Sequence, residues 1–123
     1  MPTITSDAAL TFAQSWIAAW NAHDLDAILC HYREDFEFSS PLIVKIAGVP
    51  SGQLHGKESV RAYWSKGLAL IPNLHFDLLH VLSGVDAITL VYRGHRGVVA
   101  ESFWLDSEGR VFKASACYES PPA

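Results

Sequence analysis

Residues 86–118 read DAITLVYRGHRGVVAESFWLDSEGRVFKASACY, and this stretch decides the class of fold. Three runs rich in β-branched and aromatic residues follow one another in it: Asp86–Tyr92, Val98–Leu105 and Val111–Tyr118. Residues 93–97 contain two glycines and residues 106–109 read DSEG, so both connections have the composition of tight turns. Runs of this kind joined by short turns predict three consecutive antiparallel strands.

The chain before this stretch has a different periodicity. Residues 74–82 continue the strand pattern, whereas apolar residues at helical spacing predict a long helix that begins after Ser6 or Asp7 and ends before Asn21. Two shorter helices are expected, one capped by Asp24 and one that carries Val60 to Leu68 on its apolar side. Residues 36–38 alternate like a short strand, and residues 39–56 predict a loop with one short strand at most. Helices followed by an antiparallel sheet predict an α+β domain.

Composition limits what this domain can do. The 123 residues suit one domain over residues 1–123, and 50% of them are hydrophobic while only 18% are charged. So much apolar surface predicts either an internal cavity or a subunit interface. The net charge is −4 without a run of Lys or Arg, which speaks against nucleic acid and anionic membranes as partners.

The chain shows neither a signal peptide nor an apolar stretch near the roughly 20 residues that span a bilayer, so we expect a cytoplasmic protein. Cys30 and Cys117 lie far apart in the sequence and are expected to be buried free thiols.

Four short motifs occur in an order that resembles a known family. They are Trp16–Ile28 (WIAAWNAHDLDAI), Tyr32–Pro41, Gly56–Trp64 (GKESVRAYW) and Phe103–Tyr118. Together they resemble the SnoaL-like branch of the nuclear-transport-factor-two-like superfamily, which also includes the ketosteroid isomerases. The resemblance implies a cone-shaped α+β barrel, in which a curved antiparallel sheet wraps around a long N-terminal helix with two shorter helices. It also implies a deep, mostly apolar pocket and homodimers formed through the outer face of the sheet.

Glu101 is the first candidate functional residue. Strand alternation places it on one face with Val99, Phe103 and Leu105, and a carboxyl group in such apolar surroundings must be paired, protonated or exposed at a rim. The resemblance places Glu101 where ketosteroid isomerases carry a protonated acid that donates a hydrogen bond to the substrate oxyanion. The alternative is a structural carboxylate paired with Arg93 or Arg96.

The same comparison assigns two further positions. Trp16 matches the oxyanion-hole tyrosine of the isomerases, and its indole N–H can donate a hydrogen bond or its ring can form an apolar wall. Ser40 matches their aspartate base, but a serine hydroxyl cannot take a proton near neutral pH without a partner base. The steroid isomerase mechanism is therefore not expected, although Ser40 could donate a hydrogen bond to a ligand or simply be a turn residue before Pro41.

Aromatic residues complete the predicted pocket. Trp20 on the first helix and Phe103 beside Glu101 are expected to line it. On the last strand Phe112, Ala114, Ala116 and Tyr118 share one face. The resemblance turns that face inward, so Tyr118 is expected to reach a ligand.

The histidines do not have the spacing of a metal site. His75 and His80 lie five residues apart in one strand and hence on opposite faces, and no HxxxH or HExxH pattern occurs. His31, His55, His80 or Asp77 could each reach the pocket, and the sequence does not decide among them. No phosphate loop or dinucleotide fingerprint is present, so we expect neither a metal nor a cofactor.

Three functions are compatible with these features. The first is an isomerase, cyclase or hydrolase that acts by acid–base chemistry through Glu101 on a compact apolar ketone, polyketide or terpenoid-like substrate. The second is a binding module that uses the same pocket without catalysis, which the missing base at Ser40 favours. The third is an association module whose outer sheet face packs against a partner through Val98, Ala100, Ser102 and Trp104. The sequence leaves open whether the protein is an enzyme.

Overall fold

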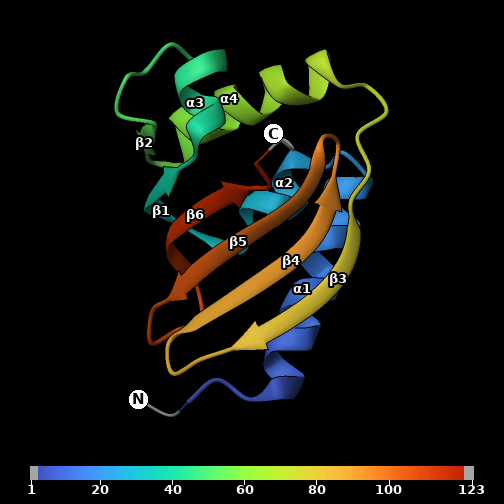
Figure 1. The fold of residues 1–123 in the computed structure, drawn as a ribbon. Helices are drawn as coiled ribbons and strands as arrows, with labels where there is room; N and C mark the ends of the chain where they lie inside the picture. Colours follow the sequence, from blue (N-terminus) through green and yellow to red (C-terminus); the bar gives the residue numbers. More distant parts are fainter. Residues whose placement is uncertain (1–2, 121–123) are drawn as a thin grey trace.

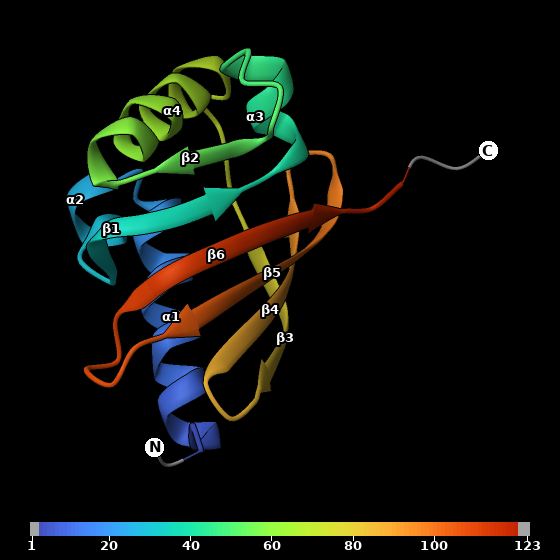
Figure 2. The ribbon, with the colours of Figure 1, turned by 90° about the vertical axis from the view of Figure 1, so that its left-hand side faces the viewer.

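A curved sheet wraps around the first helix in the computed structural model, which describes residues 3–120 (Figures 1 and 2). The six strands lie in the order β2-β1-β6-β5-β4-β3. Their bounds are β1 Tyr32–Ser39, β2 Gln53–His55, β3 Asp77–Ser83, β4 Ala87–Gly94, β5 Gly97–Leu105 and β6 Val111–Tyr118. The helices are α1 Ser6–Asn21, α2 Leu25–Leu29, α3 Pro41–Ile46 and α4 Lys57–Leu70. The predicted α+β class, with a curved sheet around a long N-terminal helix, is confirmed.

Strand pairing follows the predicted meander. β3, β4, β5 and β6 pair antiparallel in sequence order, with Leu90 opposite Glu101 and Glu101 opposite Ala116. β1 extends the sheet by pairing in parallel with β6, and β2 adds an antiparallel edge to β1. The sheet stays open, since β2 and β3 are its two edges.

Helix termini carry side-chain caps. The hydroxyl of Thr5, rather than Ser6 or Asp7, accepts a hydrogen bond from the Ala8 amide at 3.1 Å and starts α1. Asp24 caps α2 as predicted, because its carboxylate accepts from the Ala27 amide at 3.1 Å. Among residues 3–120, no helix is long and apolar enough to cross a membrane.

The segment expected to be a loop contains an additional short helix. α3 begins at Pro41, and the Ser40 hydroxyl caps it by accepting from the Leu42 amide at 3.2 Å. A proline at the first helical position and a serine before it form a start signal that outweighs the local glycines. The N-terminal helix is therefore accompanied by three shorter helices, and α3 places Ser40 at the end of β1.

Aromatic rings fill the space between α1, α4 and the concave face of the sheet. Trp16 is 1% exposed and its ring centre lies 5.2 Å from Phe103 and 5.4 Å from Tyr92. Trp64 on α4 lies edge-on to Trp20 at 5.1 Å, so the aromatic contacts continue from α1 to α4. This cluster is the core that determines how the sheet curves around α1.

Two expectations about side-chain placement are wrong. The register of β5 and β6 shifts between Trp104 and Leu105, so Phe112 is turned outward and is 37% exposed instead of facing the core with Ala114. Cys30 and Cys117 are free, but both are exposed rather than buried. Cys30 follows α2 at its solvent side, and Cys117 lies on the outer face of β6.

Candidate functional site

Glu101 lies on the concave face of β5 between Val99 and Phe103 and is only 3% exposed. The Tyr92 hydroxyl on β4 donates a hydrogen bond of 2.8 Å to its Oε1. Oε2 is buried and has no hydrogen-bond partner within residues 3–120. No ion pair in this part of the chain joins Glu101 to Arg93 or Arg96, the alternative that the sequence left open.

Burial dominates the protonation of this carboxyl group. Desolvation raises the pKa of Glu101 to about 7, and the hydrogen bond from Tyr92 opposes this rise. The group is therefore present in both protonation states near neutral pH, which is the condition under which one carboxyl can both give and take a proton.

Tyrosine hydroxyls surround the acid. Burial raises the pKa of Tyr32, Tyr92 and Tyr118 well above the usual value, and the negative charge of Glu101 adds to each rise. The pKa of Tyr63 on α4 rises to about 12 for the same two reasons. These tyrosines remain protonated, so they act as hydrogen-bond donors and not as bases.

The two predicted tryptophans differ in their hydrogen bonding. The Trp16 indole N–H already donates to the Tyr32 hydroxyl at 2.9 Å, so it is not a free donor toward a ligand. The Trp20 Nε1 atom is buried and has no partner within the described residues. A buried indole N–H usually finds an acceptor, and its absence here leaves Trp20 able to bind a ligand atom.

Ser40 and Tyr118 meet at the ends of β1 and β6. The Ser40 hydroxyl caps α3 and also donates to the Tyr118 hydroxyl at 3.3 Å, so its one donor hydrogen is used within the protein. Tyr118 is 37% exposed at this end of the sheet. A hollow of about 220 Å³ opens here, lined by Ser39, Ser40, Pro41, Val44, Ser51, Gly52, Ser115 and Ala116.

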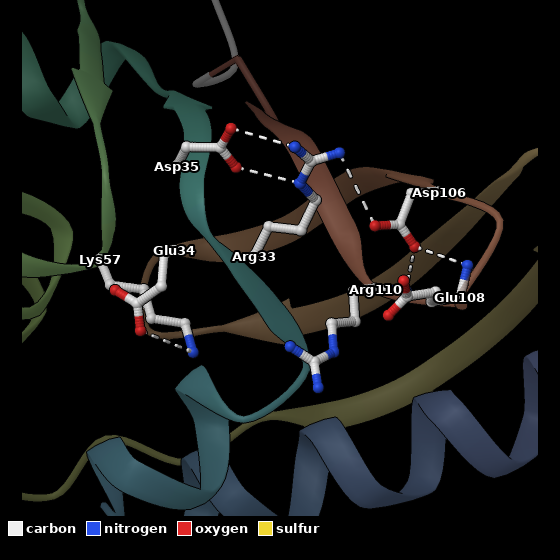
Figure 3. Close-up of polar contacts among 7 residues, drawn as sticks. All are labelled: Arg33, Glu34, Asp35, Lys57, Asp106, Glu108 and Arg110. Atoms are coloured by element: carbon white, nitrogen blue, oxygen red, sulfur yellow. Dashed lines mark hydrogen bonds and ion pairs between the residues drawn. The ribbon is translucent and has the colours of Figure 1, made fainter.

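A second hollow of about 220 Å³ lies over β1 and β6 and is charged, lined by Arg33, Asp35, Glu37, His55, Phe112 and Lys113. Figure 3 shows the Arg33 guanidinium between Asp35 and Asp106, with two bonds of 3.0 Å to Asp35 and one contact of 3.7 Å to Asp106. The hydrogen bond from Arg33 lowers the pKa of Asp35. Internal pairing of these charges makes this hollow unlike the predicted apolar pocket.

Glu101 lines neither hollow. The space beside it is occupied by the rings of Trp16, Tyr92 and Phe103, together with Phe76 from the segment before β3. Phe76 lies 4.5 Å from Tyr92 between ring centres. Aromatic side chains thus fill the interior of the cone.

No histidine of the described residues forms a hydrogen bond with Glu101. His31 is half-buried and lies 3.2 Å from the Ser15 hydroxyl, and burial lowers its pKa. His75 pairs with Asp77 at 3.2 Å on the surface, while His55 and His80 are exposed. Within residues 3–120, no group of three His, Cys, Asp or Glu side chains is placed to hold a metal ion.

The structure therefore brings Trp16, Glu101 and Phe103 together, with Trp20 one helical turn further along α1. Ser40 and Tyr118 form a separate pair at the end of the sheet. Tyr92 and Phe76 were missing from the predicted site. The alternation of Ile88, Leu90 and Tyr92 could have placed Tyr92 on the concave face, but nothing in the sequence pairs it with Glu101. The functional roles of all these residues remain predictions.

The comparisons with known proteins agree with this architecture. Residues 13–117 match the SnoaL-like domain family, and the chain belongs to that family. A SnoaL-like protein of unknown function from Burkholderia thailandensis is 52% identical over 96% of this chain and 99% of its own, with a TM-score of 0.92.

More distant structures share the fold alone. A putative isomerase of the SnoaL-like family from Agrobacterium tumefaciens is 19% identical over 88% of this chain and 94% of its own, with a TM-score of 0.69. A protein with a ketosteroid isomerase-like fold from Catenulispora acidiphila, in complex with trimethylamine, is 19% identical over 86% and 83%, with a TM-score of 0.67. No curated protein matches the chain.

Proposed function

We propose that this protein takes up a compact, mostly apolar molecule inside the cone and that Glu101 exchanges a proton with it. The observation that carries this proposal is the state of the Glu101 carboxyl group, which is 3% exposed and has one oxygen held by Tyr92 and the other without a partner among the described residues. A buried polar atom without a partner calls for a ligand or an ordered water that completes its hydrogen bonding.

The chemistry follows from the two protonation states. When protonated, Glu101 donates a hydrogen bond from Oε2 to a ligand carbonyl oxygen and stabilises the negative charge that develops there. When ionised, it accepts a proton from a carbon next to that carbonyl. A pKa of about 7 makes both states available, and the aromatic walls exclude water that would weaken these interactions. The substrate class that fits is a ketone, polyketide or terpenoid-like molecule.

Non-catalytic binding is the second candidate function, and Ser40 favours it. The Ser40 hydroxyl caps α3 and bonds to Tyr118, so it is a structural group. Only Ser40 and Glu101 are buried polar residues within the described chain, and no second carboxyl group accompanies Glu101 in the core. Catalysis would therefore depend on a single carboxyl group.

The structural neighbours support a small-molecule role without defining it. One is described as a putative isomerase and another was solved with trimethylamine, so the same fold accommodates small ligands in other proteins. The assignment to this chain depends on Glu101 and not on these neighbours.

Exchange of α-protons tests catalysis directly. Wild-type protein, Glu101→Gln and Glu108→Gln are incubated in D₂O with a panel of cyclic ketones, and deuterium incorporation at the α-carbon is followed by NMR. Glu108 lies exposed in the β5–β6 turn and provides a matched control. We expect exchange in the wild type and in Glu108→Gln, and its loss in Glu101→Gln. Ketone binding without exchange would establish the binding function, and neither binding nor exchange would leave only the association function.

Homodimer formation is part of the proposal. The outer face of β5 carries Val98, Ala100, Ser102 and Trp104, all half-buried in the single chain, and Lys113 lies over the Trp104 ring at 5.3 Å. Within the described residues, no helix covers this face (Figure 2). A second copy packed against it would bury these side chains.

We also propose that a single domain extends over residues 1–123 and functions in the cytoplasm. The two exposed free cysteines, Cys30 and Cys117, fit a reducing compartment.

A further inference from the structure

The segment that joins α4 to β3 is held by side chains instead of by a neighbouring strand. The amide of Phe76 donates to Asn21 Oδ1 at 2.7 Å, and Asn21 Nδ2 donates to the Phe76 carbonyl at 3.0 Å. His23, whose backbone has the left-handed φ of 57°, places its Nε2 atom 2.8 Å from the Leu74 carbonyl. Strand pairing with β4 begins only at Asp77. Figure 1 shows this segment descending from α4 beside α1 to the start of β3.

Phe76 is the part of this segment that enters the core. Its ring lies 4.5 Å from Tyr92, 5.5 Å from Trp20 and 5.9 Å from Trp16, stacked on the last at an interplanar angle of 21°. Tyr92 is the residue that donates to Glu101. Phe76 is only half-buried, however, so part of the residue is already in contact with solvent.

One of the two buried polar atoms without a partner in the described residues belongs to a neighbour of Phe76, and the other lies one residue further away, behind Tyr92. Trp20 Nε1 belongs to a ring in contact with Phe76, and Glu101 Oε2 belongs to the carboxyl group held by Tyr92. A hydrocarbon ring cannot satisfy either atom. A ligand ring that carries a carbonyl or hydroxyl oxygen can supply the acceptor that the Trp20 N–H lacks.

We propose that residues 71–76 form a movable strap, that the Phe76 ring occupies the position a ligand takes, and that Asn21 and His23 hold the strap closed. The proposed function underlies this inference, which adds the route of entry and the ligand class: a molecule the size of a single ring that carries at least one hydrogen-bonding oxygen. Opening exchanges three hydrogen bonds for bonds to water and moves the Phe76 ring and the Leu74 side chain, without breaking the strand pairing of the sheet.

The test removes the hydrogen bonds between Asn21 and the backbone of Phe76. Asn21→Ala removes both hydrogen bonds to Phe76, while Asn73→Ala truncates an exposed asparagine of the same segment for which no side-chain hydrogen bond is found. Both are made in a Trp104→Phe background, which removes the tryptophan on the outer face. Acrylamide quenching of the remaining tryptophans reports access to the core without any ligand. The probe for binding is 4-fluoroacetophenone, followed by its ¹⁹F resonance.

We expect Asn21→Ala to raise the acrylamide quenching constant and to accelerate probe binding by about tenfold, as the loss of two hydrogen bonds allows. Asn73→Ala should match the background protein. Phe76→Leu, a smaller change than Phe76→Ala and less disruptive to folding, should strengthen probe binding because it vacates part of the site. Each of these results supports the strap.

Equal quenching and equal probe kinetics in Asn21→Ala and Asn73→Ala would overturn the strap, even if the probe binds and its affinity depends on Glu101. In that case the proposed function is supported and the movable strap is excluded. Raised quenching in Asn21→Ala, with no probe binding to any variant, supports the movable strap and counts against the proposed function. The two failures are therefore distinguishable.

Discussion

At the scale of one residue, the proposed function depends on Glu101. A carboxyl group in an aromatic interior costs free energy in its charged form, because no cation within the described residues neutralises it and a single hydroxyl stabilises it. An apolar residue at this position would pack without that cost. The carboxyl group therefore contributes little to folding, and its free oxygen is the feature that points to a ligand.

The stability of the protein should depend on pH through this residue. The pKa of Glu101 is about 7 in the folded chain and near the ordinary glutamate value of 4.5 in the unfolded chain, so the folded state binds the proton more tightly. Its favourable contribution is fully present below the unfolded pKa and is lost as pH rises through the folded pKa. We expect the wild type to lose about 3 kcal/mol of unfolding free energy relative to Glu101→Gln between pH 4.5 and pH 8.

Urea denaturation of both proteins at several pH values measures this difference. The comparison with Glu101→Gln removes the titration of the surface carboxylates, which is common to both. A difference that stays constant from pH 4.5 to pH 8 would show that burial does not raise the pKa of Glu101.

Tyr92 should control the acidity of Glu101. Its hydroxyl stabilises the ionised carboxylate, so Tyr92→Phe should raise the pKa of Glu101 further. The carboxyl stretching band in infrared spectra, titrated against pH and assigned with Glu101→Gln, measures the shift. Tyr63→Phe serves as the control, because Tyr63 is half-buried on α4 and no hydrogen bond joins it to Glu101. A Tyr92→Phe titration that matches the control would exclude this role.

The sequence predicts some of this site and not the rest. Strand alternation places Glu101 and Phe103 on one face from local information alone. The contact between Tyr92 and Glu101 is diagonal, since Tyr92 lies opposite Val99 and Leu90 lies opposite Glu101. A diagonal contact depends on the register and twist of two strands, and the alternation of residues within one strand does not reveal either. The hydrogen bond from Trp16 to Tyr32 likewise joins α1 to β1 through the tertiary fold.

At the scale of the element, the residues of the tight turns predict the strand connections correctly. The DSEG turn predicted the β5–β6 connection, where Gly109 has a φ of 79° and the Asp106 carboxylate accepts from the amides of Glu108 and Arg110, both at 2.9 Å. The sequence pattern did not predict helix α3. The helix has only six residues and a serine cap, and the prolines and glycines around it are typical of a loop. The bulge near Trp104 turns the Phe112 side chain to the outer face of the sheet. A bulge adds one unpaired residue to a strand, and the alternation of faces is interrupted there.

Two glycine substitutions should have opposite effects on stability. Gly109→Ala places a side chain at a positive φ and should lower the unfolding free energy by about 1 kcal/mol. Gly67 lies inside α4, where an added Cβ would meet no atom within 4 Å, so Gly67→Ala should raise stability by about 1 kcal/mol. Thermal denaturation of both variants checks the signs. The same sign for both would contradict the backbone assignment at one of them.

At the scale of the whole molecule, the sheet has two different faces. The concave face packs on α1 and encloses Glu101, while the outer face of β5 carries Val98, Ala100, Ser102 and Trp104. Figure 2 shows the outer face of β6 and β5 turned away from α1. Val98, Ala100 and Trp104 on a face that no helix of the described residues covers support the proposed subunit interface.

A charge placed in the middle of this face should prevent self-association. Ala100 is half-buried at the centre of β5, so Ala100→Glu should convert the proposed homodimer into monomers, because a buried unpaired carboxylate is costly. Val44→Glu adds the same charge at an exposed position on α3 and should leave the dimer intact. Sedimentation velocity separates the two states. A wild-type protein that is monomeric at micromolar concentration would contradict the proposed homodimer.

The central claim is that one carboxyl group inside the cone titrates near neutral pH. It is tested most directly by NMR of protein labelled with ¹³C at the glutamate carboxyl carbons, with Glu101→Gln to assign the resonance. The account predicts that Glu101 titrates with a pKa of about 7, far above the ordinary value of a glutamate side chain. A Glu101 resonance that titrates near the ordinary pKa of a glutamate side chain would contradict it.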